Sequence, residues 1–314
     1  MLTVDSFHHG FRIPAPARFS LLLFVCLPWF APPDSFAAGE TGSPPGIFYS
    51  VKAYGAAGDG KQVDTRAIQA AIDAAAEAGG GTVFFPAGVY LSTTVFLKSR
   101  ITLHLGAGAT WLGGRDPADY PPARPKIRSY TDNYVNQSLI YGEDLEDVAI
   151  TGRGVIDGQG EAFHWTEYRN RPYLIRLVSC RNVLIEGVTL RNSAMWMQHY
   201  LACENLTVRG ISVFNHVTYN NDGIDVDGCR AVRIADCVFD SDDDALCLKS
   251  TTGRPTEDVT ITNCVVERMR NAVAMGAHAG YLRVYDTVIR ECEMGFGASA
   301  YGTTAANNAQ AVSN

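Results

Sequence analysis

The sequence predicts an all-β solenoid, a parallel β-helix preceded by one capping α-helix. A short strand motif recurs between residues 146 and 292 at intervals of 23–35 residues. Cysteines recur at matching places in that motif, and one strong helical pattern precedes all of its copies. Repeats of this length, each made of short strands, are typical of chains whose coils stack on one another.

The first segment, residues 1–37, is a predicted secretory signal. Arg12 and Arg18 precede an apolar run at 19–30, and a small-residue pattern ends at Ala37. A basic start, a short apolar run and such an ending are typical of a signal peptide and not of a membrane span. We therefore expect a secreted protein, extracellular or periplasmic, with no membrane association after cleavage, and a linker at 38–50.

Composition limits the class of partner. The 314-residue chain is 46% hydrophobic and has a formal net charge of −7, which indicates a globular and acidic protein. Nucleic acid is excluded as a partner because its binding needs a basic face. An acidic polysaccharide stays open, since a cleft can carry its own local cations.

An amphipathic helix is predicted at residues 65–78, before the repeats. Ile68 and Ile72 share one face, Asp64 or Thr65 can cap the N-terminus, and three glycines follow the last turn. The open end of a β-helix exposes core that something must cover, so this helix is expected to cap it.

Six fragments carry the repeated motif: a polar pair, an apolar residue, any residue, a second apolar residue and a second short strand. Successive copies are 35, 23, 26, 27 and 23 residues apart, too short for a propeller blade of about 40–45 residues. We expect a β-helix over residues 51–300, with a cap region at 51–90. The first apolar positions are Val148, Val183, Leu206, Val232, Val259 and Leu282.

Seven cysteines remain once the signal is removed. Two sets lie in register with the repeat, Cys180, Cys203 and Cys229 before the apolar position and Cys237 and Cys264 after it. Neighbours in register on parallel strands seldom meet disulfide geometry, so buried thiols are favoured over disulfides. No CxxC pair is present, and no metal site is predicted.

Carboxylates concentrate between residues 222 and 244, where eight aspartates occur. Matching Ile224 with Leu246 places Asp222 beside Asp244 on the adjacent coil, at roughly the 4.8 Å spacing of paired strands. Close carboxylates raise at least one pKa, as a general acid working near neutral pH requires. We assign chemistry to Asp222, Asp243 and Asp244. Solvated turns or calcium binding are favoured for Asp225, Asp227, Asp236 and Asp240.

The chain resembles the polygalacturonase-type enzymes of glycoside hydrolase family 28. Residues 51–90 are similar to the family's N-terminal region, and Asn220-Asn221-Asp222-Gly223 resembles its Asn-Thr-Asp-Gly motif. Asp243-Asp244 resembles its paired aspartates, and Asn192-Ser193 followed by Trp196 and His199 is similar to the preceding coil. The resemblance implies a right-handed parallel β-helix that hydrolyses pectin-like polysaccharide with inversion and without a cofactor.

The resemblance also implies residue roles. Asp243, or alternatively Asp244, would protonate the leaving oxygen, while Asp222 and the remaining partner activate water on the opposite face. Asn220 and His199 would contact substrate.

Two family motifs are missing. Where the family has Gly-His-Gly, this chain has Met269-Arg270-Asn271, so Arg270 is expected beside Asp243 as an alternative charge partner, or else as a surface arginine. The family's Arg-x-Lys, which grips the substrate carboxylate, is also absent. Lys249 is the best remaining ligand for that carboxylate, and a neutral or deoxy sugar chain stays open as substrate.

The tail at 301–314 is polar and without alternation, and is predicted to be disordered at the end of a truncated reading frame. Two other functions stay open: a non-catalytic carbohydrate-binding β-helix or inactive fragment, and a polysaccharide lyase whose aspartates hold calcium. We expect a monomer.

Overall fold

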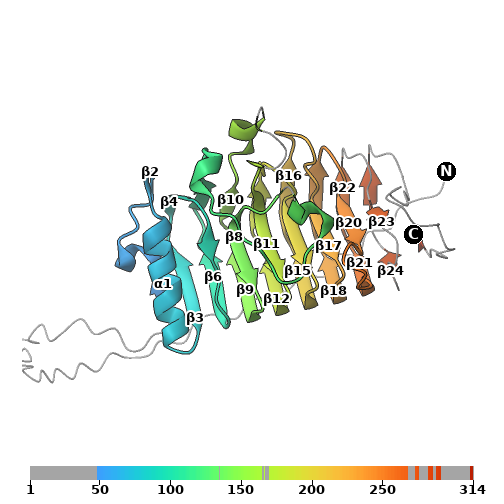
Figure 1. Cartoon of the computed structure of the whole chain (residues 1–314), viewed down its shortest axis with the longest axis horizontal. Helices are drawn as coiled ribbons and strands as arrows, with labels where there is room; N and C mark the ends of the chain where they lie inside the picture. Colours follow the sequence, from blue (N-terminus) through green and yellow to red (C-terminus); the bar gives the residue numbers. More distant parts are fainter. Residues whose placement is uncertain are drawn as a thin grey trace, which may run out of the picture. The chain divides into compact units, whose positions relative to one another are not determined.

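The computed structural model describes residues 48–133, 135–164, 166 and 170–267, and the backbone of four short strands at 273–275, 282–285, 288–290 and 312–313. Three parallel sheets enclose one core in the described residues, and successive strands pass from sheet to sheet (Figure 1). The predicted all-β right-handed parallel β-helix is confirmed.

Sheet A contains, in spatial order, β1 (Phe48–Ser50), β3 (Gly81–Phe85), β6 (Ile101–Leu105), β9 (Glu146–Gly152), β12 (Arg181–Glu186), β15 (Glu204–Arg209), β18 (Arg230–Ala235), β21 (Glu257–Thr262), β24 (Leu282–Tyr285) and β26 (Val312–Ser313). Sheet B contains β2 (Asp59–Val63), β4 (Gly88–Ser92), β7 (Ala109–Gly113), β10 (Val155–Asp157), β13 (Thr189–Arg191), β16 (Ser212–Asn215), β19 (Val238–Ser241), β22 (Val265–Glu267) and β25 (Val288–Arg290). Sheet C contains β5 (Val95–Phe96), β8 (Ser138–Glu143), β11 (Tyr173–Val178), β14 (Gln198–Leu201), β17 (Ile224–Asp227), β20 (Leu246–Lys249) and β23 (Val273–Met275). The helices are η1 (Val51–Tyr54), α1 (Thr65–Glu77), η2 (Pro117–Asp119), η3 (Tyr130–Asn133) and η4 (Gly160–Phe163).

The predicted repeat register is confirmed in sheet A. The first apolar residue of each copy pairs with that of the next copy, from Val148 through to Leu282. The second apolar residues, such as Ile185 and Ile234, are fully buried. The alternating pattern therefore directs one side of every strand into the common core.

The polar pair that opens each repeat has a backbone function. Its second residue adopts a left-handed conformation in coil after coil, with φ of 54–57° at Asp147, Asn182, Asn205 and Ala231. Asn and Asp tolerate this region better than other residues with a Cβ atom. Asn205 donates a side-chain hydrogen bond to Asn182 at 2.8 Å, so the bend is also linked from coil to coil.

The cysteine stacks are confirmed as buried free thiols. All six cysteines in the described part of the chain are free and buried. The backbone N–H of Cys203 donates to the sulfur of Cys229 at 3.2 Å, as expected for stacked neighbours. The thiols therefore pack as small core residues.

Helix α1 forms where it was predicted, one residue shorter. It contacts β1 and β3 at the first coils, with Ile68 and Ile72 fully buried. Asp64 occupies the N-cap position, but its carboxylate accepts from the backbone N–H groups of Ala57 and Gly58 at 2.7 and 3.0 Å. The predicted side-chain cap of α1 is wrong because the carboxylate of Asp64 accepts hydrogen bonds from the preceding turn and not from the first turn of the helix.

One domain boundary is corrected. The predicted linker at 38–50 contains β1, because Phe48–Ser50 pairs with the strand β3, so the first sheet begins at Phe48. The signal segment at 1–37 lies outside the described residues, as does the predicted tail apart from the backbone of β26. None of the helices in the described residues has the length and apolar character that crossing a membrane requires.

Ala231 generates a stability prediction. A residue with a Cβ atom pays about 1–2 kcal/mol in the left-handed region, and glycine avoids this cost but has a more flexible unfolded chain. We therefore expect Ala231→Gly to raise the free energy of unfolding by about 0.5–1 kcal/mol. Chemical denaturation monitored by circular dichroism measures it.

Ala235, in the same strand but outside the positive-φ set, is the matched control. Ala235→Gly is expected to lower stability by about 0.5–1 kcal/mol. Equal losses in both variants would contradict the backbone argument.

Candidate functional site

The site forms where β17 and β20 pair in sheet C. Ile224 pairs with Leu246 and Val226 with Leu248, as the sequence predicted. The residues before each strand continue this stacking, because the backbone N–H of Gly223 donates to the carbonyl of Asp244 at 2.8 Å. Asp222 and Asp244 therefore lie on adjacent coils.

A thiol shows that the two carboxylates converge. The Sγ of Cys247 lies 3.1 Å from Oδ2 of Asp244 and 3.6 Å from Oδ2 of Asp222. Asp222 is 4% exposed, whereas Asp243 and Asp244 are partly exposed. The arrangement thus puts one buried carboxylate next to two that solvent reaches.

Burial dominates the electrostatics of Asp222. Desolvation raises its pKa well above the usual range, and the carboxylate of Asp225 raises it further. Asp243 and Asp244 act in the same direction, and the ammonium of Lys249 opposes them. We name Asp222, Asp225, Asp243 and Asp244 the carboxylate cluster.

Asp225 is a site residue that the sequence reasoning missed. The sequence predicted a solvated turn or calcium binding for Asp225, and the solvated turn is wrong because its side chain is fully buried. Burial raises its pKa to about 7, against the lowering effect of Lys249. The available signal was register: Asp225 pairs with Cys247, and Lys249 follows two residues later on the same side of β20.

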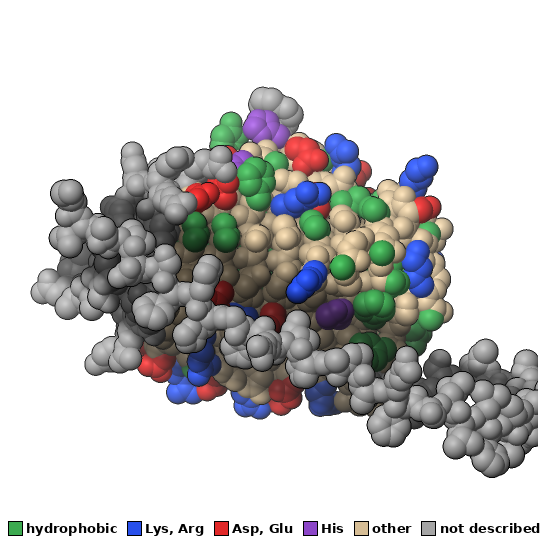
Figure 2. Space-filling view, turned by 180° about the vertical axis from the view of Figure 1, so that it is seen from behind, with side chains coloured by type: hydrophobic (Ala, Val, Ile, Leu, Met, Phe, Trp, Pro, Cys, Tyr) green, Lys and Arg blue, Asp and Glu red, His purple; other side chains and the backbone are tan. Residues whose placement is uncertain are grey.

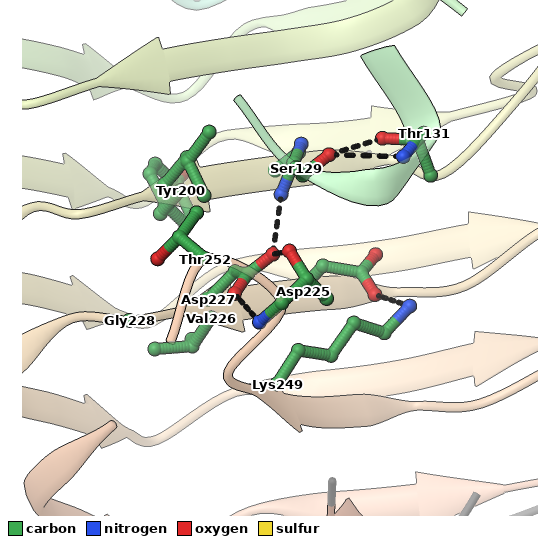
Figure 3. A network of polar contacts seen from close by, with 12 residues as sticks. Ser129, Thr131, Tyr200, Asp225, Val226, Asp227, Gly228, Lys249 and Thr252 are labelled. Carbon is green, nitrogen blue, oxygen red and sulfur yellow. Dashed lines mark hydrogen bonds and ion pairs between the residues drawn. The ribbon is translucent and has the colours of Figure 1, made fainter. Parts of the chain in front are cut away.

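Lys249 has partners within the protein. Its Nζ lies 2.6 Å from Oδ1 of Asp225 (Figure 3) and 3.6 Å from Oδ2 of Asp222. It also lies 3.3 Å from the centre of the Trp196 ring, a cation–π geometry. Lys249, which was predicted to bind a substrate carboxylate, thus already contacts two carboxylates and an aromatic ring of the protein.

His199 is brought to the site but buried beneath it. It is fully buried, packs against Tyr173 and Trp196, and has Nε2 3.6 Å from Oδ2 of Asp227. Burial lowers its pKa. No part of the side chain reaches solvent in this structure, so the contact of His199 with substrate stays a prediction.

A covering segment explains this burial. Arg176, in register with His199, forms a 2.7 Å ion pair with Asp132 of η3, and both side chains are almost completely buried. Tyr130 of the same segment packs against Trp196. The side of sheet C that faces away from the core is therefore covered by protein at this point.

Asn220 lies at the edge of the site. Its side-chain oxygen accepts from Arg171 at 3.2 Å, and Arg171 also donates to the carbonyl of Tyr219. Asn220 is partly exposed and remains a candidate for substrate contact. Arg270, the expected partner of Asp243, lies outside the described residues.

A second polar group adjoins the paired aspartates. His216 contacts Asp242 through Nδ1 at 2.6 Å and Asp240 through Nε2 at 2.5 Å. The sequence predicted a solvated turn or calcium binding for Asp240, but it is only 6% exposed and contacts this imidazole. The strand end before Asp243 is thereby anchored to the previous coil.

A metal ion is sterically conceivable at one place in the described residues. Asp222, Asp225 and Cys247 present ligand atoms within 4.8 Å of one another. The Lys249 ammonium lies against both carboxylates, so a bound cation would compete with a charge that the protein already supplies.

One face of the molecule carries mixed charge. On the face opposite to that of Figure 1, acidic, basic and hydrophobic side chains are interspersed (Figure 2). This face differs from the uniformly basic surface that nucleic-acid binding uses.

Known proteins are similar to this chain in sequence and in architecture. The chain is 35% identical over 232 residues to a probable polygalacturonase from Vitis vinifera, covering 66% of this chain and 47% of the relative. It is 28% identical over 293 residues to an exo-poly-alpha-D-galacturonosidase from Dickeya chrysanthemi, covering 74% and 48%. The chain thus spans about half the length of these relatives.

A solved structure agrees with them. The hyperthermoactive exopolygalacturonase from Thermotoga maritima superposes with a TM-score of 0.66 and 27% identity, covering 78% of this chain and 66% of that one. The resemblance to polygalacturonase-type β-helices is confirmed. Residues 48–297 match the description rhamnogalacturonase A/epimerase, pectate lyase-like, and the chain belongs to that family.

Proposed function

We propose that this protein is a secreted glycoside hydrolase that cleaves pectin-like polysaccharide with inversion. The observation that carries the proposal is the stacking of Asp222 beside Asp244, with Asp243 adjacent and partly exposed. The polygalacturonase names of the relatives support the reaction and the substrate class. Export through the segment 1–37 and a monomeric state belong to the same proposal.

The proposed chemistry uses two proton transfers. Asp243 donates its proton to the oxygen of the leaving sugar as the glycosidic bond breaks. Asp222 and Asp244 take a proton from a water molecule whose oxygen attacks the anomeric carbon from the opposite face. An inverting enzyme needs about 6.5–9.5 Å between acid and base to admit that water.

The lyase alternative gains no support from Lys249, the lysine that the described residues place at the carboxylate cluster. A lyase needs a basic side chain that removes a proton next to the sugar carboxylate, and Lys249 instead forms an ion pair with Asp225. The same pair weakens the expectation that Lys249 selects galacturonate. The backbone sugar is therefore to be found by assay, with polygalacturonate and rhamnogalacturonan as the first substrates.

Asp243→Asn tests the acid. Its carboxamide has no proton of suitable acidity, so we expect reducing-sugar release to fall about 10²–10⁴-fold. The matched control is Asp236→Asn, because Asp236 is exposed and its carboxylate accepts from Asn263. Normal release by the Asp243 variant, or equal loss in the control, would remove the assignment.

The reaction type has its own test. Proton NMR of the first product should show inverted anomeric configuration, since water attacks directly. A hydrolase creates no double bond, so no ultraviolet absorbance should develop and a chelator should leave the rate unchanged. Absorbance that grows with turnover and vanishes with chelator would establish a lyase.

A further inference from the structure

We propose that Lys249 is a positioning residue, the internal counter-ion that favours the ionised form of Asp222, the base, and not the ligand of a substrate carboxylate. This inference rests on the proposed function. It replaces the role expected for Lys249 from the sequence, and it gives Asp225 and Trp196 defined parts in the site.

The position of the ammonium carries the argument. Nζ lies between two carboxylates, at 2.6 Å from Asp225 and 3.6 Å from Asp222, and against the face of Trp196. The Lys249 side chain is only 16% exposed. These contacts direct the charge toward the protein's own carboxylates, and Figure 3 shows the ammonium pointing at Asp225.

Trp196 fixes this geometry from below. Its ring packs against His199 and Tyr173 and is 2% exposed, so it cannot move aside easily. An ammonium on a buried indole face is stabilised by the ring's negative surface. Lys249 is therefore held in place even when no substrate is bound.

Charge balance explains why the cation is needed. Asp222 and Asp225 are both buried, and two adjacent ionised carboxylates without a counter-charge would be strongly unfavourable. In the described residues Lys249 is the cation that forms ion pairs with these two groups. Lys249 lowers the pKa of both carboxylates against the effect of their burial. Without it both would hold a proton to higher pH, and a protonated Asp222 could not accept one from water.

Other ionisable groups around Lys249 do not replace it. Asp225, Cys247, Asp222 and Tyr130 all act on the ammonium by raising its pKa. Burial lowers the pKa of His199 and so favours its neutral form, which supplies no positive charge to the two carboxylates. The surroundings consequently keep Lys249 charged, against the effect of its own burial.

The test replaces the ammonium in the full chain and follows pH. Lys249→Met keeps the length of the side chain and removes its charge, so Asp222 should stay protonated to higher pH. We expect the acidic limb of the kcat profile to move up by at least one pH unit, with more than a tenfold loss of kcat at pH 5 and less than a threefold change in KM. Lys249→Arg should restore most of the profile.

The opposite pattern would overturn the inference. If Lys249 bound a substrate carboxylate, Lys249→Met would raise KM strongly for polygalacturonate and leave the pH limb in place. The control is Lys98→Met, which removes the exposed ion pair with Asp73 and should change neither quantity.

A measurement without substrate separates this inference from the proposed function. An aspartate whose pKa is raised in the folded protein contributes to the free energy of unfolding while it is protonated. This contribution is lost as the pH rises from the pKa of the unfolded state, about 3.9, through the pKa of the folded state. For Asp225 in the native protein this window ends at about 7. Removing Lys249 raises the folded pKa further, so Lys249→Met should go on losing stability above pH 7, where this contribution levels off in wild type.

Thermal unfolding of both proteins between pH 4.5 and 8.5 reads this difference. A difference in unfolding temperature between wild type and Lys249→Met that grows with pH supports the counter-ion role, even if no polysaccharide is cleaved. A difference in unfolding temperature that is constant over this range would contradict the inference, whatever the activity. Lys98→Met should track wild type throughout.

Discussion

Register between neighbouring parallel coils is the constraint on which the rest of this structure depends. Side-chain period along a strand is two, so a slip of one residue would turn every core residue outward. The ladder through Val183, Leu206 and Val232 prevents that slip in sheet A. The same register, carried around each coil, brings Asp222 next to Asp244 although 22 positions separate them in the chain.

The chemistry of the site depends on how its outward side is covered. In sheet C, Arg176, His199, Asp225 and Cys247 form one row across four strands. The ion pair between Arg176 and Asp132 holds η3 over that row. Breaking a buried pair of this kind leaves an uncompensated charge, which commonly costs about 3–5 kcal/mol. The same ion pair thus stabilises the fold and keeps η3 against the outer side of sheet C, near the buried carboxylates.

Much of the fold followed from local patterns. Strand alternation and repeat spacing predicted the stacked coils, and the helix at α1 followed from its apolar face and its glycine stop. The N-terminal boundary was misplaced because Phe48–Ser50 is too short to show a pattern and becomes a strand only by pairing with β3. The cap at Asp64 was misassigned because its partners, Ala57 and Gly58, reach it only through a turn.

The sequence by itself determined the fold class and the identity of the aspartate pair, because residue spacing alone sets which positions stack. Only the tertiary structure decided the environment of each charge. Asp225 and His199 are buried, and η3, a segment distant in the sequence, covers their neighbours Arg176 and Trp196, which no local sequence pattern indicates. Lys249 is turned inward because Trp196, 53 residues earlier, supplies the face on which its ammonium rests. Desolvation and ion pairing depend on distances in space, so they became visible only in the folded chain.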